Sequence, residues 1–155
     1  MAASDWDLKQ MPAMVEPNVL VRGDASGFEQ EVVAGTHRLK ADEPVSAGGA
    51  DTGAAPYDLL LGALGACTSM TLGMYARREK WPLKRVVVRL RHSRIHSEDC
   101  LSCETGGSVL DQIEREVELT GPLTVEQRSR LLEIAQRCPI HRALTAGIRS
   151  RTWLA

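Results

Sequence analysis

The sequence is short of aromatic residues. Its 155 residues include one Phe, two Tyr and three Trp, which together make 4% of the chain. Aromatic rings usually supply much of the buried area in small domains, so this core must be built from Leu, Val, Ile, Ala and Met. A chain of this length can bury a core of its own. The shortage nevertheless predicts that something else completes the core.

The sequence also lacks a net charge of either sign. Nineteen basic residues oppose twenty acidic ones, for a net charge of −1. With this balance, the overall charge gives no attraction to nucleic acid or to an anionic membrane. A local basic run over residues 77–94 is matched by glutamates over residues 114–118, and paired strands would set Arg opposite Glu. We therefore expect neither a nucleic-acid partner nor a membrane partner.

Several common signatures are missing as well. The N-terminal stretch MAASDWDLKQ has no apolar region of the kind found in signal peptides, which predicts a cytoplasmic protein. No phosphate-binding glycine loop, HExxH motif or serine nucleophile elbow is present. With no repeat or linker visible, we expect one domain over residues 1–155, of which residues 1–16 form a poorly ordered extension.

The hydrophobic pattern predicts a mixed fold. Short strands are expected over residues 19–21, 28–33 and 36–40, followed by a long Gly/Ala/Pro-rich loop over residues 42–56. From Leu59 to Ala76 there is no charged residue, nearly the length of a membrane span. Interspersed glycines and hydroxyl residues favour a fully buried central helix instead. Its small residues form a stripe that would let another helix approach closely: Gly62, Ala66, Ser69 and Gly73.

In the second half of the chain, apolar and charged residues first alternate with a period of two, and a helical pattern follows. Apolar and charged residues alternate over residues 85–91 and 113–119, which predicts an antiparallel hairpin. Thr124 is a helix N-cap candidate, and that helix should end near Cys138. A short helical turn over residues 139–144 and a final strand over residues 148–154 complete the prediction.

Cys138 stands directly before Pro139, and proline favours the first position of a helix. Cys138 would then be the N-cap, where free backbone N–H groups and the helix dipole lower the pKa of a thiol. His141 and Arg142 would add to this effect if they face the sulfur. The alternative is a small residue buried at a helix junction.

Cys67 lies too deep in the predicted central helix for help from the helix terminus. Apolar neighbours should raise its pKa, so a reactive Cys67 needs a cation delivered from another segment. The spacing alone favours a core cysteine.

His92, His96, Cys100 and Cys103 form the pattern H-x3-H-x3-C-x2-C. All four are zinc-ligand types, but the histidines fall on a strand end, where His92 would face inward as a hydrogen-bonded core residue. Three interpretations stay open: a zinc site, a second redox pair, or no special chemistry.

Two blocks resemble the OsmC/Ohr family of osmotically inducible and organic hydroperoxide resistance proteins: GGADTGAAPYDLLLGALGACTSMTLGMYA around Cys67 and AQRCPIHRAL around Cys138. The resemblance runs from about residue 17 to the end. It implies an α+β fold with antiparallel sheets around a long buried central helix, in an intertwined homodimer. The DCLSCE segment around Cys100 and Cys103 is similar to that of an OsmC-like subgroup.

The resemblance also implies a thiol peroxidase acting on organic hydroperoxides or hydrogen peroxide. Cys67 would be the peroxidatic thiolate, and Cys138 would resolve its sulfenic acid as a disulfide. An external dithiol would restore the pair, with no metal or organic cofactor. A non-catalytic protein that senses redox state, or binds zinc or a small ligand, is the alternative.

In this family an Arg stabilises the thiolate and is itself held by a Glu just after the loop proline. This chain instead has Tyr57 at that place, followed by Asp58. Arg22 and Arg38 both lie in the region expected for the Arg. Asp58, Arg22 and Arg38 are therefore further candidates for the catalytic site.

Overall fold

A computed structural model describes residues 17–96, 109–152 and 154. These residues form three α-helices and two antiparallel sheets, which confirms the predicted α+β class. They divide into two compact units between Pro56 and Tyr57. That the chain is one domain stays a prediction, and its expected N-terminal extension, residues 1–16, lies outside the described residues.

The first unit is a three-stranded sheet in the order β1-β2-β3. Its strands are β1 (Val19–Gly23), β2 (Gln30–Ala34) and β3 (His37–Ala41), close to the predicted positions. The β2–β3 turn closes on the pair Ala34 and His37, and Gly35 takes the positive φ of 60° that such a two-residue turn requires.

The predicted long loop after β3 is organised around one carboxylate. Asp42 is only 3% exposed and accepts hydrogen bonds from the backbone N–H groups of Glu43, Ala50 and Thr52, at 2.8, 3.0 and 3.1 Å. The Thr52 hydroxyl also donates to it, at 3.1 Å. These bonds, with the Thr52 backbone foremost, lower the pKa of Asp42 despite its burial. The loop, including the 3-10 turn η2 (Val45–Ala47), is therefore held in a defined conformation.

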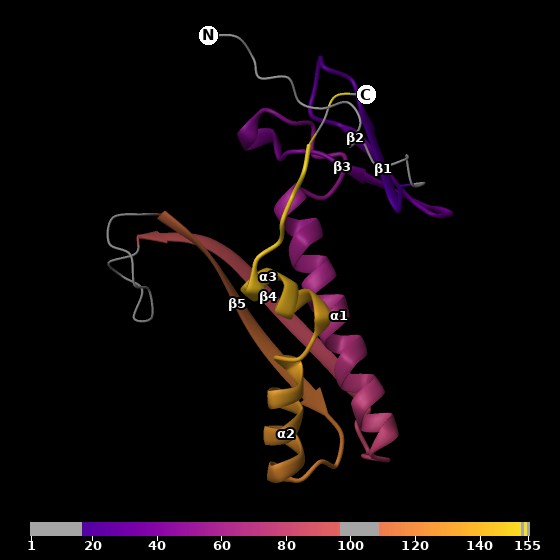
Figure 1. Ribbon diagram of the computed structural model, residues 1–155, viewed down its shortest axis with the longest axis vertical. Helices are drawn as coiled ribbons and strands as arrows, with labels where there is room; N and C mark the ends of the chain where they lie inside the picture. Colours follow the sequence, from indigo (N-terminus) through magenta and orange to yellow (C-terminus); the bar gives the residue numbers. More distant parts are fainter. Residues whose placement is uncertain (1–16, 97–108, 153, 155) are drawn as a thin grey trace, which may run out of the picture. The chain divides into compact units, whose positions relative to one another are not determined.

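The second unit packs helices against one face of a long hairpin. Helix α1 (Pro56–Arg78) precedes the strands β4 (Arg85–His96) and β5 (Val109–Thr120), and α2 (Val125–Ala135) and α3 (Pro139–Ala146) follow them. Figure 1 shows α1 running along the hairpin with α2 and α3 beside it. The core between α1, α2 and the hairpin consists of Leu72, Ala76, Leu131, Ile134 and Ala135.

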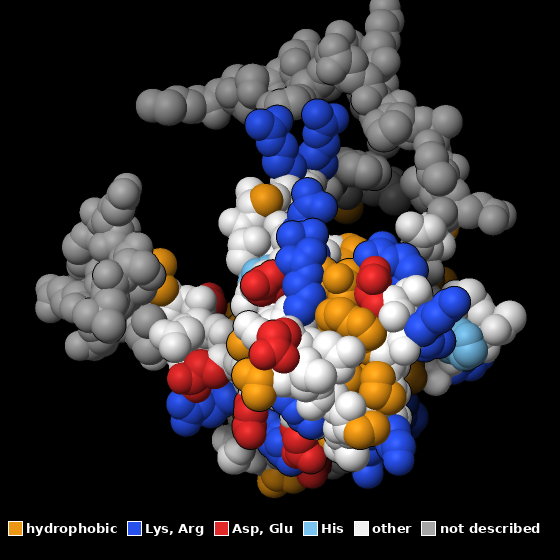
Figure 2. Space-filling model, turned by 90° about the horizontal axis from the view of Figure 1, so that it is seen from below, with side chains coloured by type: hydrophobic (Ala, Val, Ile, Leu, Met, Phe, Trp, Pro, Cys, Tyr) orange, Lys and Arg blue, Asp and Glu red, His pale blue; other side chains and the backbone are white. Residues whose placement is uncertain are grey.

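The hairpin has the predicted ladder of opposite charges on its outer face. Arg89 pairs with Glu116 at 3.5 Å and Arg91 with Glu114 at 2.5 Å, each directly across the strands. These pairs are exposed, so each contributes little to stability, but they neutralise the basic run. The face in Figure 2 likewise carries basic and acidic side chains side by side, with hydrophobic ones between them.

Helix α1 is buried along one side only. Leu64, Thr68 and Leu72 are buried, whereas Met70 and Met74 on the other side are 72% and 62% exposed. The expectation of a helix buried all round therefore does not hold within the single chain. By length and composition α1 could cross a membrane, yet its buried side packs into the core of the second unit.

The C-terminal third confirms two predictions and corrects one. Thr124 caps α2 in a reciprocal capping box with Gln127, and α3 begins at Pro139 as expected. The predicted strand over residues 148–154 is wrong. A strand needs a hydrogen-bonded neighbour, but residues 148–152 and 154 join neither sheet, and Ile148 is 69% exposed.

Candidate active site

Two cysteines that are far apart in the sequence meet inside the second unit. Cys67 comes from the middle of α1, and Cys138 from the junction between α2 and α3. Both are free thiols, and they lie close enough for each to shift the pKa of the other. Cys67 is half-buried, whereas Cys138 is completely buried. Of the two cysteines, Cys67 is therefore the one that a solute can reach.

Cys138 is the N-cap of α3, as its position before Pro139 predicts. Its sulfur makes no well-formed capping hydrogen bond, but the backbone N–H groups of His141 and Ile140 still stabilise its thiolate. The sequence predicts that the side chains of His141 and Arg142 also lower the pKa of the Cys138 thiol, and the structure does not show this. Arg142 is exposed, and His141 acts through its backbone.

The two thiols differ in acidity. Burial, followed by the hydrogen bond with Cys138, raises the pKa of Cys67 above its usual value. Burial acts in the same direction on Cys138, but it is outweighed by hydrogen bonds from Cys67, the His141 backbone and Thr68, so the pKa of Cys138 is lowered.

One cation, which the sequence reasoning missed, contacts the residue that follows Cys67 in the chain. Arg115 on β5 donates a hydrogen bond from Nη1 to the hydroxyl of Thr68, 2.8 Å away, and a longer one to Gln136 at 3.4 Å. Thr68 is fully buried and adjoins Cys67 in the sequence. The sequence does contain a signal for this residue. On a strand where apolar and charged residues alternate, Arg115 takes an inward-facing place between Ile113 and Val117, where an apolar residue is expected.

The arginines expected from the family resemblance lie in the first unit. Arg22 and Arg38 both pair with Glu31 on the exposed surface of its sheet. The Arg38 hydrogen bond is the largest influence on Glu31 and lowers the pKa of that carboxyl. Asp58 is exposed in the first turn of α1, where a carboxylate is favourable to the helix dipole.

Tyr57, at the place of the family's glutamate, belongs to a separate cluster. Its ring stacks on His92 with centroids 4.0 Å apart, and His92 Nε2 is 2.7 Å from an Asp111 carboxylate oxygen. Arg94 approaches the same carboxylate at 3.5 Å. His92 is thus a largely buried, hydrogen-bonded residue, as the strand pattern predicts.

The possible zinc ligands are only partly described. No group of three or more potential ligands occurs among the residues that the structure describes. Cys100 and Cys103 lie outside those residues, as do the atoms of the His96 side chain. Zinc binding and a second redox pair at these four positions therefore stay predictions.

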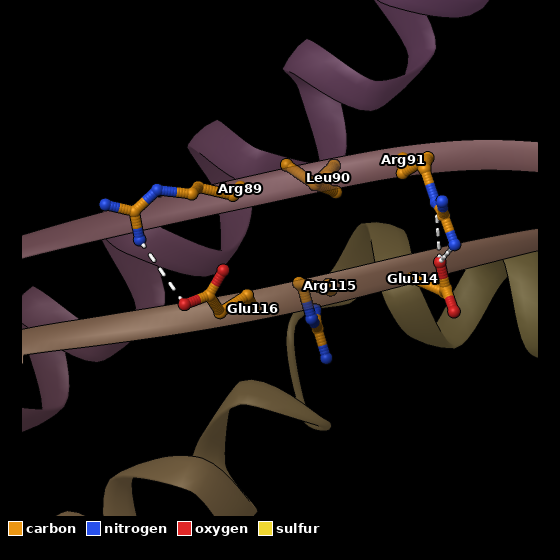
Figure 3. A pocket seen from close by; sticks show the side chains of 6 residues that line it. All are labelled: Arg89, Leu90, Arg91, Glu114, Arg115 and Glu116. Carbon is orange, nitrogen blue, oxygen red and sulfur yellow. Dashed lines mark hydrogen bonds and ion pairs between the residues drawn. The ribbon is translucent and has the colours of Figure 1, made fainter.

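One depression on the surface of the hairpin is separate from the two thiols. It has a volume of about 340 Å³ and is lined by hairpin residues alone: Arg89, Leu90, Arg91, Glu114, Arg115 and Glu116. Figure 3 shows its ion pairs, with Arg115 pointing away from them. Neither cysteine contributes to this depression, so we assign it no role in thiol chemistry.

The fold and the site together define a class of protein: an α+β chain with a reduced thiol pair, one thiol on a long helix and the other at a helix N-cap. The chain belongs to the OsmC-like protein family, whose family model matches residues 48–152. No curated protein matches the sequence.

Solved structures agree with the family in fold. A putative osmotic stress induced and detoxification response protein from Psychrobacter arcticus has 14% identity and a TM-score of 0.66, over 86% of this chain and 90% of that one. The organic hydroperoxide resistance protein OsmC from Legionella pneumophila has 19% identity and a TM-score of 0.60, covering 84% and 91%. An organic hydroperoxide resistance protein from Elizabethkingia anophelis has 23% identity and a TM-score of 0.61, covering 86% and 90%.

Proposed function

We propose that this protein is a cytoplasmic, thiol-dependent peroxidase that reduces organic hydroperoxides or hydrogen peroxide. The observation that carries the proposal is the neighbouring pair of free thiols, in which Cys67 is accessible and Cys138 is not. Structural neighbours named as organic hydroperoxide resistance proteins support the choice of substrate.

The chemistry follows from this difference in exposure. The Cys67 sulfur attacks the peroxide, the O–O bond breaks, and an alcohol or water leaves while Cys67 becomes a sulfenic acid. The Cys138 sulfur then attacks the Cys67 sulfur, which releases water and leaves a disulfide. The thiols themselves supply both electrons, so we expect no metal or organic cofactor. An external dithiol restores the reduced pair by thiol–disulfide exchange.

A panel of peroxides tests the proposal directly. The purified protein is given cumene hydroperoxide, tert-butyl hydroperoxide or hydrogen peroxide, with dithiothreitol or dihydrolipoamide as reductant. We expect catalytic peroxide loss and, without reductant, a disulfide that joins Cys67 to Cys138 in peptide mass mapping. Failure to consume any of these peroxides, or an oxidised product in which both cysteines remain free thiols, would count against peroxidase function.

We further propose that the working unit is a homodimer. The exposed side of α1 is apolar over more than two turns, with Ala66, Met70 and Met74 along it. A second copy of the chain would remove this surface from water and complete a core that lacks aromatic residues.

Substitutions on this side of α1 test the dimer. Met70→Lys should shift the protein from dimer to monomer in multi-angle light scattering, because dimerisation would now bury a charge. Met70→Leu, which keeps the apolar surface, should leave the dimer intact. A wild-type protein that is monomeric at every accessible concentration would refute the proposal.

A further inference from the structure

Arg115 is a charged residue on the helical side of the hairpin. Its directly paired neighbour across the strands is Leu90, which packs so tightly on α1 that a Cβ atom at Gly65 would lie 2.9 Å from it. Because cross-strand partners share one face of a sheet, Arg115 lies on the same side. Figure 3 shows its side chain directed away from the ion pairs of the outer face. Arg115 is therefore placed to bond to groups on the helices.

The guanidinium of Arg115 joins two segments that are far apart in the sequence. Nη1 donates to the Thr68 hydroxyl on α1 at 2.8 Å, and Nη2 donates to the side-chain oxygen of Gln136 at 3.4 Å. Thr68 directly follows Cys67. Gln136 is the C-cap of α2 and stands two residues before Cys138. One side chain thus forms a bridge between the two segments that carry the thiols.

Arg115 makes this bridge in place of an ion pair. On the same hairpin, Arg89, Arg91 and Arg94 each pair with a carboxylate. Within the described ranges, no carboxylate lies at ion-pair distance from Arg115, whose hydrogen bonds go to two neutral groups. A guanidinium presents its N–H groups in a rigid, planar fork. With no carboxylate competing for the fork, its two partners are held at a set separation.

The two ends of the bridge differ in firmness. Thr68 is fully buried, and its hydroxyl hydrogen goes to a carbonyl of α1 at 2.8 Å, so its oxygen accepts from Arg115 in a fixed orientation. Gln136 is exposed, and its hydrogen bond is the longer one. Next to it, the backbone N–H of Cys138 reaches the Ala135 carbonyl only at 3.4 Å. The junction of α2 and α3 is therefore the side that needs an external hold.

From this arrangement we propose that Arg115 is a positioning residue that sets the separation of the two thiols. Its bridge from Thr68 to Gln136 holds the junction of α2 and α3 against α1. The Cys138 sulfur thereby stays within reach of Cys67, and a disulfide between them is favoured. This disulfide is the one in the peroxidase cycle proposed above, so the role of Arg115 rests on that function.

Glutathione measures this effect without any peroxide. A thiolate of the pair attacks oxidised glutathione and releases one reduced glutathione, and the second cysteine then attacks the mixed disulfide and releases the other. The protein loses two electrons and two protons, which the two glutathione molecules take up. Because the second step is intramolecular, the equilibrium constant reports the effective concentration of one thiol at the other.

The test is this equilibrium in a chain that keeps only the two thiols of the site, made by Cys100→Ser and Cys103→Ser. The disulfide fraction is read from the mass of alkylated protein over a series of glutathione buffers. Arg115→Met should lower the equilibrium constant about tenfold, which raises the reduction potential of the pair by about 30 mV. Arg89→Met, on the outer face, should leave the constant unchanged.

Variants that keep the positive charge separate position from electrostatics. Thr68→Val and Gln136→Leu each break one end of the bridge, and each should lower the constant, Gln136→Leu by about threefold because its hydrogen bond is long. Thr68→Ser, which keeps the hydroxyl, should retain the parent value. Arg115→Lys keeps the charge but lacks the fork, so it should behave like Arg115→Met. Gln136 is exposed, and Gln136→Leu therefore tests the bridge even if Arg115→Met does not fold.

Three results would overturn the proposal. The first is a constant equal to that of the parent in folded Arg115→Met, or in Gln136→Leu. The second is full recovery in Arg115→Lys, which would assign the effect to charge alone. The third is a parent chain that forms no disulfide between Cys67 and Cys138. If the disulfide forms and responds to Arg115 while the wild type consumes no peroxide, the peroxidase function fails and the positioning role holds.

Discussion

Cys67→Ser should lower the rate of peroxide consumption at least about a thousandfold, because a serine hydroxyl cannot replace the sulfur nucleophile. Cys138 is completely buried and cannot substitute for it. The measurement is peroxide loss under excess dithiol, with circular dichroism to show that the fold is retained.

Cys138→Ser is the informative comparison for this variant. It should keep the first step, since Cys67 remains accessible, but it has no partner thiol to resolve the sulfenic acid. One equivalent of peroxide should be consumed without reductant, and a sulfenic acid on Cys67 should be trapped by dimedone. Wild-type turnover in Cys67→Ser, or trapping on another cysteine, would place the chemistry elsewhere in the chain.

The second large effect concerns the core beneath the site. Leu131→Ala should lower the free energy of unfolding by about 2 to 5 kcal/mol, because Leu131 is fully buried and its truncation leaves a cavity among α1, α2 and the hairpin. The adjacent Leu132 is 57% exposed. Leu132→Ala should therefore change stability by no more than about 0.5 kcal/mol.

Urea unfolding of the two variants checks this difference. The neighbouring positions share a helix and a residue type, so helix propensity cancels and burial alone separates them. Equal destabilisation by both substitutions would mean that α2 does not face the core in the way described. A large effect of Leu132→Ala alone would instead indicate that a second chain covers that position.

Most of the fold could be predicted from local pattern. The period-two stretches over residues 85–91 and 113–119 gave the hairpin, and Thr124 and Pro139 gave two helix starts, because these signals depend on neighbours in the sequence. The strand predicted over residues 148–154 failed for the opposite reason. Alternation identifies a strand only when a partner strand is available, and the sequence of the segment does not say whether one is.

The site was predictable only in part. That Cys138 stands at a helix N-cap and that Cys67 lies in the middle of a helix both follow from local sequence. That the two cysteines meet, and that Arg115 contacts Thr68 next to Cys67, depends on how α1 packs against the hairpin and the junction of α2 and α3. The family resemblance places the cation in the N-terminal region, at Arg22 or Arg38, whereas Arg115 stands between two glutamates on a strand, where an arginine is typical of an exposed charged face.

The charges on the outer face of the hairpin affect whether two copies of the chain can associate through their strand edges. Among the described residues β4 and β5 pair only with each other, so each strand has an outer edge with free backbone groups. Such edges invite pairing between molecules. Here β4 carries arginines and β5 glutamates, so two copies that met through the same edge would set like charges against each other. Charge repulsion therefore opposes the pairing of two identical edges. We expect this repulsion to hinder the growth of fibres by repeated pairing of such edges at high protein concentration.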